Sequence, residues 1–212
     1  MLSGDRSNPD RFRMQDEEEE STGTKQTELS PSIDKRLLDA RTLLIHGPVD
    51  DKLAAHCVSR LMVMEQMDPE RPITVMINSP GGSADSGFAI YDILKFVRPP
   101  VYTVVNGLCA SAGILIQLAT EKERRVATPQ SRFLIHQPST AGFGTASDLD
   151  ITAREVIKLR QRYNQIISDA TGQDQEKVLE DARRDFWLSA DEAIEYGLIN
   201  RAVVNHSELD YH

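Results

Sequence analysis

Short apolar runs and helically spaced apolar residues alternate along the first half of the chain. Residues 43–45, 73–77 and 101–105 form short aliphatic runs, a pattern typical of buried strands. Between these runs, apolar residues recur at helical spacing over 53–64 and 84–97, so each of the first two runs is followed by a predicted helix. An alternating series of strands and helices predicts an α/β fold with a parallel sheet and right-handed crossovers.

The second half of the chain continues this pattern with shorter strands. Two strand-like runs, at 125–127 and 132–135, precede small residues at 139–146 that suit an exposed extended segment. After this segment the sequence predicts an amphipathic helix over 148–170 that ends at Gly172, a helix over 175–183, a helix that begins at the Ser189–Glu192 capping box and stops at Gly197, and a closing strand over 198–204.

The first 30 residues and the last few residues do not continue this pattern of strands and helices. Residues 1–30 are polar and contain an acidic run at 16–20, so we expect a flexible acidic arm that buries too little apolar surface to become ordered. A plain disordered tail and a dedicated binding segment both fit this arm, and the tail is favoured. The remaining pattern predicts a single domain over 31–205 and a C-terminal tail over 206–212.

Charge and cysteine content narrow the class of protein. The net charge of −9 argues against nucleic-acid binding, which needs a concentrated basic face. No apolar run reaches the roughly 20 residues that span a bilayer, and no apolar stretch of signal-peptide length begins the chain. Cys57 and Cys109 lie in apolar surroundings and are expected to be buried thiols of a reducing compartment. We therefore expect a cytoplasmic protein without membrane contact.

The sequence also contains no phosphate-binding loop of the Gly-x-x-x-x-Gly-Lys-Ser/Thr type. We therefore expect the chain to bind no ATP itself and to need no other cofactor or metal.

Small residues surround one hydroxyl, Ser111, where the strand at 101–105 is predicted to turn into a helix. A side chain at a helix N-terminus lies near free backbone N–H groups, which stabilise a developing anion. This placement suits a nucleophile. An ordinary serine N-cap is the alternative that the residues alone leave open.

Two further segments carry candidate chemistry. The strand at 73–77 runs into Asn-Ser-Pro-Gly-Gly at 78–82, where paired glycines leave backbone N–H groups unshielded. This turn is either a simple connection between strand and helix or a cradle for an anion. His136 follows the strand at 132–135, and a lone histidine at a strand end is more often structural than catalytic.

Four blocks of sequence together resemble the Clp protease family of proteolytic subunits. They are Ile-Asn-Ser-Pro-Gly-Gly at 77–82, Ala-Ser-Ala-Gly at 110–113, Ile-His-Gln-Pro at 135–138 and Arg-Asp-Phe-Trp-Leu-Ser at 184–189. The resemblance covers residues 33–204 and implies a serine endopeptidase with a triad in the order Ser, His, Asp. Carried over by motif, Ser111 would be the nucleophile, His136 the general base and Asp185 the acid that orients the histidine. The backbone N–H groups of Gly82 and Ala112 would form the oxyanion hole.

The same resemblance implies an architecture and a set of partners. Family members have a crotonase-like fold of stacked βαβ units with a protruding helical handle, here about 139–170. Heptameric rings stack in pairs through these handles and enclose a chamber, where residues 139–146 would pair with an extended peptide. An ATP-hydrolysing AAA+ unfoldase would dock on the ring and feed unfolded polypeptide inward for protein degradation and quality control.

Three places depart from the family pattern. In the strand at 73–77 the family carries aromatics in the pocket that receives the unfoldase, whereas this chain has Thr74 and Met76. Two residues before Asp185 an acidic residue usually pairs across the ring–ring contact, whereas this chain has Arg183. The long acidic arm replaces the family's N-terminal axial segment. The sequence therefore leaves open which unfoldase docks and whether the rings contain one type of subunit.

Two other functions share parts of this pattern. A non-catalytic ring subunit would explain the departures, but such relatives typically lack one or more triad residues. An acyl-CoA-processing enzyme of the wider crotonase fold would share the glycine-rich oxyanion turns, but it would not need Ser111, His136 and Asp185 together. The presence of all three residues favours the peptidase.

Overall fold

A largely parallel sheet lies at the centre of the computed structural model, which describes residues 30–138 and 143–209. The main path of the sheet runs in the order β1, β2, β3, β4, β7. These strands span Thr42–His46, Ile73–Ser79, Val101–Ala110, Arg125–Ala127 and Arg201–Ala202. All of the pairings along this path are parallel, which confirms the parallel sheet predicted from the alternating pattern.

Strand β3 pairs with two different neighbours on its outer side. Its first half pairs with β4, whereas Leu108–Ala110 pairs in parallel with β5, which spans Arg132–Ile135. The change of partner occurs at Gly107, whose φ of 132° lies in the region that favours glycine. A Cβ atom there would lie 2.8 Å from Asn78 Oδ1, so both the backbone conformation and the close approach require glycine.

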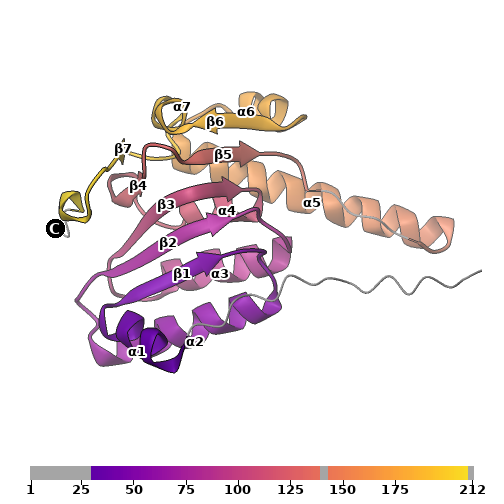
Figure 1. Cartoon of the computed structure of the whole chain (residues 1–212). Helices are drawn as coiled ribbons and strands as arrows, with labels where there is room; N and C mark the ends of the chain where they lie inside the picture. The colour runs from indigo at the N-terminus through magenta and orange to yellow at the C-terminus, as the bar shows by residue number, and fades with distance from the viewer. Residues whose placement is uncertain (1–29, 139–142, 210–212) are drawn as a thin grey trace, which may run out of the picture.

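Helices cover one face of this sheet (Figure 1). Helices α2 and α3 span Asp51–Met67 and Ala84–Phe96, and the short helix α4 spans Ala112–Gln117. The other helical segments are α1 at Pro31–Asp39, α5 at Ala146–Thr171, α6 at Gln175–Asp181, α7 at Ala190–Tyr196 and the 3₁₀ turns η1 at Lys122–Arg124 and η2 at His206–Glu208. No helix in residues 30–138 and 143–209 has the length and apolarity needed to cross a membrane.

Alternate side chains of β2 divide the apolar residues between the two faces of the sheet. Ile73, Val75 and Ile77 are fully buried in the main core. On the opposite face, Met76 packs against a second, smaller cluster that includes Leu209. The sequence pattern assigned residues 206–212 to a tail, and Leu209 shows that the beginning of this segment packs against the domain.

The long helix α5 extends well beyond the edge of the sheet (Figure 1). It begins at a capping box made by Thr145 and Asp148 and ends at Gly172, whose φ is 77°. Its buried residues, Tyr163, Asn164 and Ile167, all lie in its second half. The helix predicted over 148–170 is therefore confirmed, and its first half protrudes as the resemblance implied. Residues 1–29 and 139–142, on which the predictions for the arm and part of the extended segment fall, lie outside the described residues.

Several boundaries differ from the sequence prediction, and two elements were missed. Helix α1 was not predicted because it buries no residue fully, although Ser30 and Pro31 form an ordinary helix start. The strand β6 at Phe186–Ser189 was missed because it is short and pairs antiparallel with the distant β5. The closing strand predicted over 198–204 contracts to the two residues of β7, and α6 ends before the predicted position at 183.

One buried arginine connects the start of the sheet to the end of α2. Arg41 is 2% exposed and has a φ of 54°, an uncommon value for a residue other than glycine. Its guanidinium donates hydrogen bonds to the carbonyl oxygens of Met64, Asp68, Arg71 and Pro72, at distances of 2.7–3.1 Å. These bonds satisfy carbonyls at the C-terminal end of α2 and in the loop that leads to β2.

We predict that Arg41→Met lowers the free energy of unfolding by about 3 kcal/mol, because it leaves several partly buried carbonyls without a donor. The matched control is Arg154→Met, which removes an exposed pair with Asp150 and should change stability by less than about 1 kcal/mol. Urea unfolding at one fixed protein concentration measures both values. Equal effects of the two substitutions would contradict the role assigned to Arg41.

Candidate active site

Three turns at the carboxyl ends of neighbouring parallel strands bring the predicted site residues together. Gly82 follows β2, Ser111 follows β3 and His136 follows β5. Because β2 pairs with β3 and β3 pairs with β5, all in parallel, these turns lie at one edge of the sheet. A different pairing positions Asp185. It precedes β6, which pairs antiparallel with β5 through Ile135 and Phe186, so Asp185 lies opposite His136.

Ser111 occupies a strained backbone conformation between β3 and α4. Its φ and ψ are 53° and −119°, and its side chain makes no capping hydrogen bond to the helix. Its N–H donates to the carbonyl of Leu134 on β5, at 3.0 Å. A residue held in such a region costs roughly 1–3 kcal/mol and persists where the surrounding structure imposes it. Ser111 therefore occupies the N-cap position of α4, but its hydroxyl does not act as a side-chain cap. The turn resembles the strained strand-to-helix turn that exposes a serine hydroxyl.

The glycines at 81 and 82 allow the loop after β2 to approach the serine turn closely. Gly81 has a φ of 86°, and a Cβ atom there would lie 2.6 Å from Ser111 Cβ and 2.7 Å from the carbonyl oxygen of Ala110. Gly82 forms a parallel bridge with Val49. In this bridge the N–H of Val49 donates to the carbonyl of Gly81, and the carbonyl of Val49 accepts from the N–H of Ser83. In this bridge geometry the N–H of Gly82 itself points away from Val49.

The N–H of Ala112 belongs to the first turn of α4, whose amides have no acceptor within the helix. Gly82 and Ala112 line the same pocket as Ser111. The structure thus brings both predicted oxyanion donors to the serine turn, and their role as donors stays a prediction.

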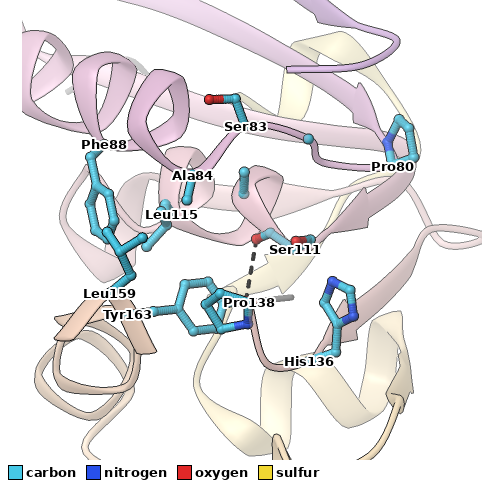
Figure 2. A pocket seen from close by; sticks show the side chains of 12 residues that line it. Pro80, Ser83, Ala84, Phe88, Ser111, Leu115, His136, Pro138, Leu159 and Tyr163 are labelled. Atoms are coloured by element: carbon cyan, nitrogen blue, oxygen red, sulfur yellow. Dashed lines mark hydrogen bonds between the residues drawn. The ribbon is translucent and has the colours of Figure 1, made fainter. Parts of the chain in front are cut away.

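His136 and Asp185 face each other at the outer side of the site. The distance from His136 Nδ1 to Asp185 Oδ1 is 3.7 Å, which is too long for a hydrogen bond. The Asp185 side chain is 66% exposed, so solvent screens this pair. Within the described part of the chain, no hydrogen bond joins the Ser111 hydroxyl to His136. Figure 2 shows the imidazole of His136 on the same side of the pocket as Ser111. Catalytic hydrogen bonds are often long in a free enzyme and shorten when substrate binds.

A pocket of about 320 Å³ opens beside Ser111. Figure 2 shows Ser111 between His136 on one side and an apolar group of Phe88, Leu115 and Leu159 on the other. Tyr163 closes the pocket from α5, and its hydroxyl donates to the backbone carbonyl of Ser111 at 3.2 Å. A pocket with apolar walls and a few polar groups at one end suits an apolar side chain of a bound peptide.

The wall of this pocket is not predicted by the sequence pattern. Helical spacing places Tyr163 on the apolar face of the predicted helix, and the pattern gives Phe88, Leu115 and Leu159 no role in a site. A tyrosine on a buried face was the available signal, since a buried phenol hydroxyl normally has a hydrogen-bond partner. Among the described residues, no group of three or more His, Cys, Asp or Glu side chains is placed to hold a metal ion.

A strained serine turn with a histidine, a carboxylate and free backbone amides nearby is typical of serine hydrolases. Comparison with known proteins identifies the family within this class. The model of the Clp protease family matches residues 25–206, so the chain belongs to the Clp protease family. It is a serine peptidase that serves ATP-dependent protein degradation. This family match also favours the peptidase over the acyl-CoA-processing alternative.

Individual relatives are similar over most of their length. The chain is 42% identical to ATP-dependent Clp protease proteolytic subunit 3 of Rhizobium etli over 193 residues, which cover 91% of this chain and 99% of the relative. It is 45% identical to proteolytic subunit 1 of Chlamydia caviae over 179 residues, covering 84% and 94% of the two chains. A solved structure of a ClpP1 mutant from Listeria monocytogenes superposes with a TM-score of 0.78 at 41% identity, covering 84% of this chain and 99% of that one. The fold is therefore the ClpP fold predicted from the resemblance.

We predict that Gly81→Ala lowers peptide hydrolysis at least about a hundredfold, because the new methyl group would displace the serine turn. Gly172→Ala is the matched control, since Gly172 also has a positive φ but an added Cβ meets no atom within 4 Å. Both variants carry a backbone strain of about 1 kcal/mol, and only Gly81→Ala should lose activity. Thermal unfolding together with hydrolysis of a fluorogenic peptide separates the two effects. Similar activities in both variants would show that the contact between Gly81 and Ser111 does not matter.

Proposed function

We propose that Ser111 is the nucleophile of this peptidase, with His136 as the general base and Asp185 as the residue that orients the histidine. The observation that carries this proposal is the Ser111 turn. Its strained backbone leaves the hydroxyl without a capping role and beside a pocket that His136 also lines. The register of β5 and β6 supports the role of Asp185, because it places this carboxylate on the Nδ1 side of His136.

The proposed chemistry follows from these positions. His136 takes the proton of Ser111 as Oγ attacks the peptide carbonyl, and it then passes this proton to the leaving amine. The N–H groups of Gly82 and Ala112 bind the oxygen that becomes negative, and each such donor typically contributes about 3 kcal/mol to the transition state. Water then releases the acyl group from Ser111 by the reverse sequence of proton transfers. Asp185 holds the imidazole in the required tautomer and stabilises its cation.

Unfolded polypeptide is the proposed substrate. The apolar pocket formed by Phe88, Leu115, Leu159 and Tyr163 accepts the side chain before the cleaved bond. The remaining contacts of an extended peptide are to backbone groups, so many sequences fit. Residues 139–142 of the segment predicted to pair with the peptide lie outside the described residues, and residues 143–145 form no strand.

Assembly into paired heptameric rings and feeding by an AAA+ unfoldase complete the proposal. The protruding half of α5 supports it, because Leu149, Ile151 and Ile157 there are 42–61% exposed. Exposed apolar side chains on a projecting helix fit a contact with another subunit. The unfoldase would hydrolyse ATP, and this chain would bind none. We place this activity in the cytoplasm, in keeping with the free, buried thiols of Cys57 and Cys109.

We predict that Ser111→Ala abolishes hydrolysis while leaving the fold and assembly intact. Activity should fall by several orders of magnitude, because the triad acts as one unit. Stability should hardly change, since the Ser111 side chain makes no capping bond that the alanine would lose. Hydrolysis of a fluorogenic peptide, fluorophosphonate labelling and circular dichroism test these points together. A folded Ser111→Ala protein that retains more than about a tenth of the wild-type rate would rule out Ser111 as the nucleophile.

We also predict that Arg183→Glu shifts the population from single rings to paired rings. Arg183 forms an exposed ion pair with Glu180 on the preceding turn, at 3.0 Å, so it offers no acidic group to a facing subunit. A glutamate at this position would present an anion to Arg184 of the opposite ring. One exposed pair contributes only about 0–1 kcal/mol, but the ring multiplies it.

Native mass spectrometry measures the ring distribution of wild type and variant. Arg183→Gln is the control, because it removes the cation without adding an anion and should cause a smaller shift. Identical distributions in all three proteins would contradict the proposed part of Arg183 in ring pairing.

A further inference from the structure

The backbone carbonyl of Ser111 accepts two hydrogen bonds from different parts of the fold. One comes from the N–H of Ile114 in the same turn, at 2.9 Å. The other comes from the hydroxyl of Tyr163 on α5, at 3.2 Å, and is the dashed line in Figure 2. Tyr163 is 4% exposed, and burial raises the pKa of its phenol, so the hydroxyl stays protonated and remains a donor.

The carbonyl of Ser111 and the N–H of Ala112 belong to one planar trans peptide group. They point in opposite directions, so fixing the direction of the carbonyl also fixes the direction of the N–H. This peptide follows a residue with a φ of 53° and a ψ of −119°, an arrangement that the isolated chain would not favour. Restraint from outside the turn is therefore needed to hold the N–H in one direction.

We propose that Tyr163 is a positioning residue for catalysis: its hydroxyl holds the Ser111–Ala112 peptide so that the N–H of Ala112 points at the substrate oxygen. This inference rests on the proposed function, in which Ala112 supplies an oxyanion donor. The bond from Tyr163 stabilises the transition state indirectly, through the peptide group that it orients.

The need to satisfy a buried acceptor does not explain this bond. The carbonyl of Ser111 already accepts from Ile114, so the bond from Tyr163 is a second one. A second donor from a separate helix defines the orientation of the peptide plane, which a single bond within the turn leaves free to tilt. Polarisation of the carbonyl also makes the N–H on the same peptide a stronger donor, since linked hydrogen bonds reinforce each other.

The test compares Tyr163→Phe with wild type in the full-length, assembled protein. Phenylalanine keeps the ring that walls the pocket and removes only the hydroxyl, so KM for a fluorogenic peptide should stay within about twofold. The kcat value should fall about tenfold, because the lost restraint matters where charge develops on the oxygen. Affinity for a peptide boronic acid, which forms a tetrahedral adduct with the serine, should fall by a similar factor.

Thr103→Val is the matched control. Thr103 is fully buried, and its hydroxyl donates to the carbonyl of Gln117 at the other end of α4, at 3.3 Å. The control removes the same kind of bond from the same helix, and its kcat should be unchanged. An unchanged kcat in Tyr163→Phe, or equal losses in both variants, would overturn the inference.

A second variant, Tyr163→Met, replaces Tyr163→Phe if the latter fails to assemble, since methionine adapts to irregular space. It should show the same loss of kcat, and failure of both variants to fold would make Tyr163 a structural residue and overturn the inference. The proposed function is tested separately by wild type. Fluorophosphonate labelling of wild type at Ser111 combined with a normal kcat in Tyr163→Phe would reject the positioning role alone. Absence of labelling in wild type would reject the proposed function and the inference together.

Discussion

The division of β3 between two neighbouring strands is the constraint on which the site depends. Before Gly107 the strand pairs with β4, and after it the strand pairs with β5. Only the second pairing brings the end of β5, and with it His136, next to Ser111. The register of β6 against β5 then determines the position of Asp185. A single change of partner in one strand thus sets three of the candidate site residues relative to one another.

The site combines strain with surroundings that are well packed. Ser111 adopts a conformation that costs roughly 1–3 kcal/mol by itself, yet the end of β3 before it and the helix α4 after it are buried. Its N–H bonds to β5, and its carbonyl bonds to Ile114 and Tyr163. These contacts come from β5, α4 and α5, which are stabilised by their own apolar side chains in the main core. The free-energy cost of the strained Ser111 backbone is therefore offset by the apolar side chains buried in the core. The Ser111 hydroxyl remains available because it makes no capping hydrogen bond.

The local sequence pattern predicted the central strands, the serine turn and the glycine turn, because each depends on residues that are close in sequence. The 73–77 run needed only its apolar side chains, and the turn at 78–82 needed only its glycines. The proximity of Asp185 to His136 could not be predicted in this way, since it depends on pairing between segments far apart in the chain, and only the family resemblance supplied it. The hydrogen bond of Tyr163 was missed for a related reason: helical spacing predicts which face is buried, but it does not identify the partner of a hydroxyl on that face.

Helix α5 connects two parts of the molecule that serve different purposes. Its first half protrudes and exposes apolar side chains, whereas its second half is anchored by Tyr163, Asn164 and Ile167. The anchored part contributes Leu159 and Tyr163 to the wall of the pocket, and Tyr163 also contacts the backbone of Ser111. The same helix therefore carries both the surface proposed for ring pairing and the hydroxyl that contacts the carbonyl of Ser111. It also contacts the residue that follows His136, because Arg160 donates a hydrogen bond to the side-chain oxygen of Gln137 at 3.3 Å.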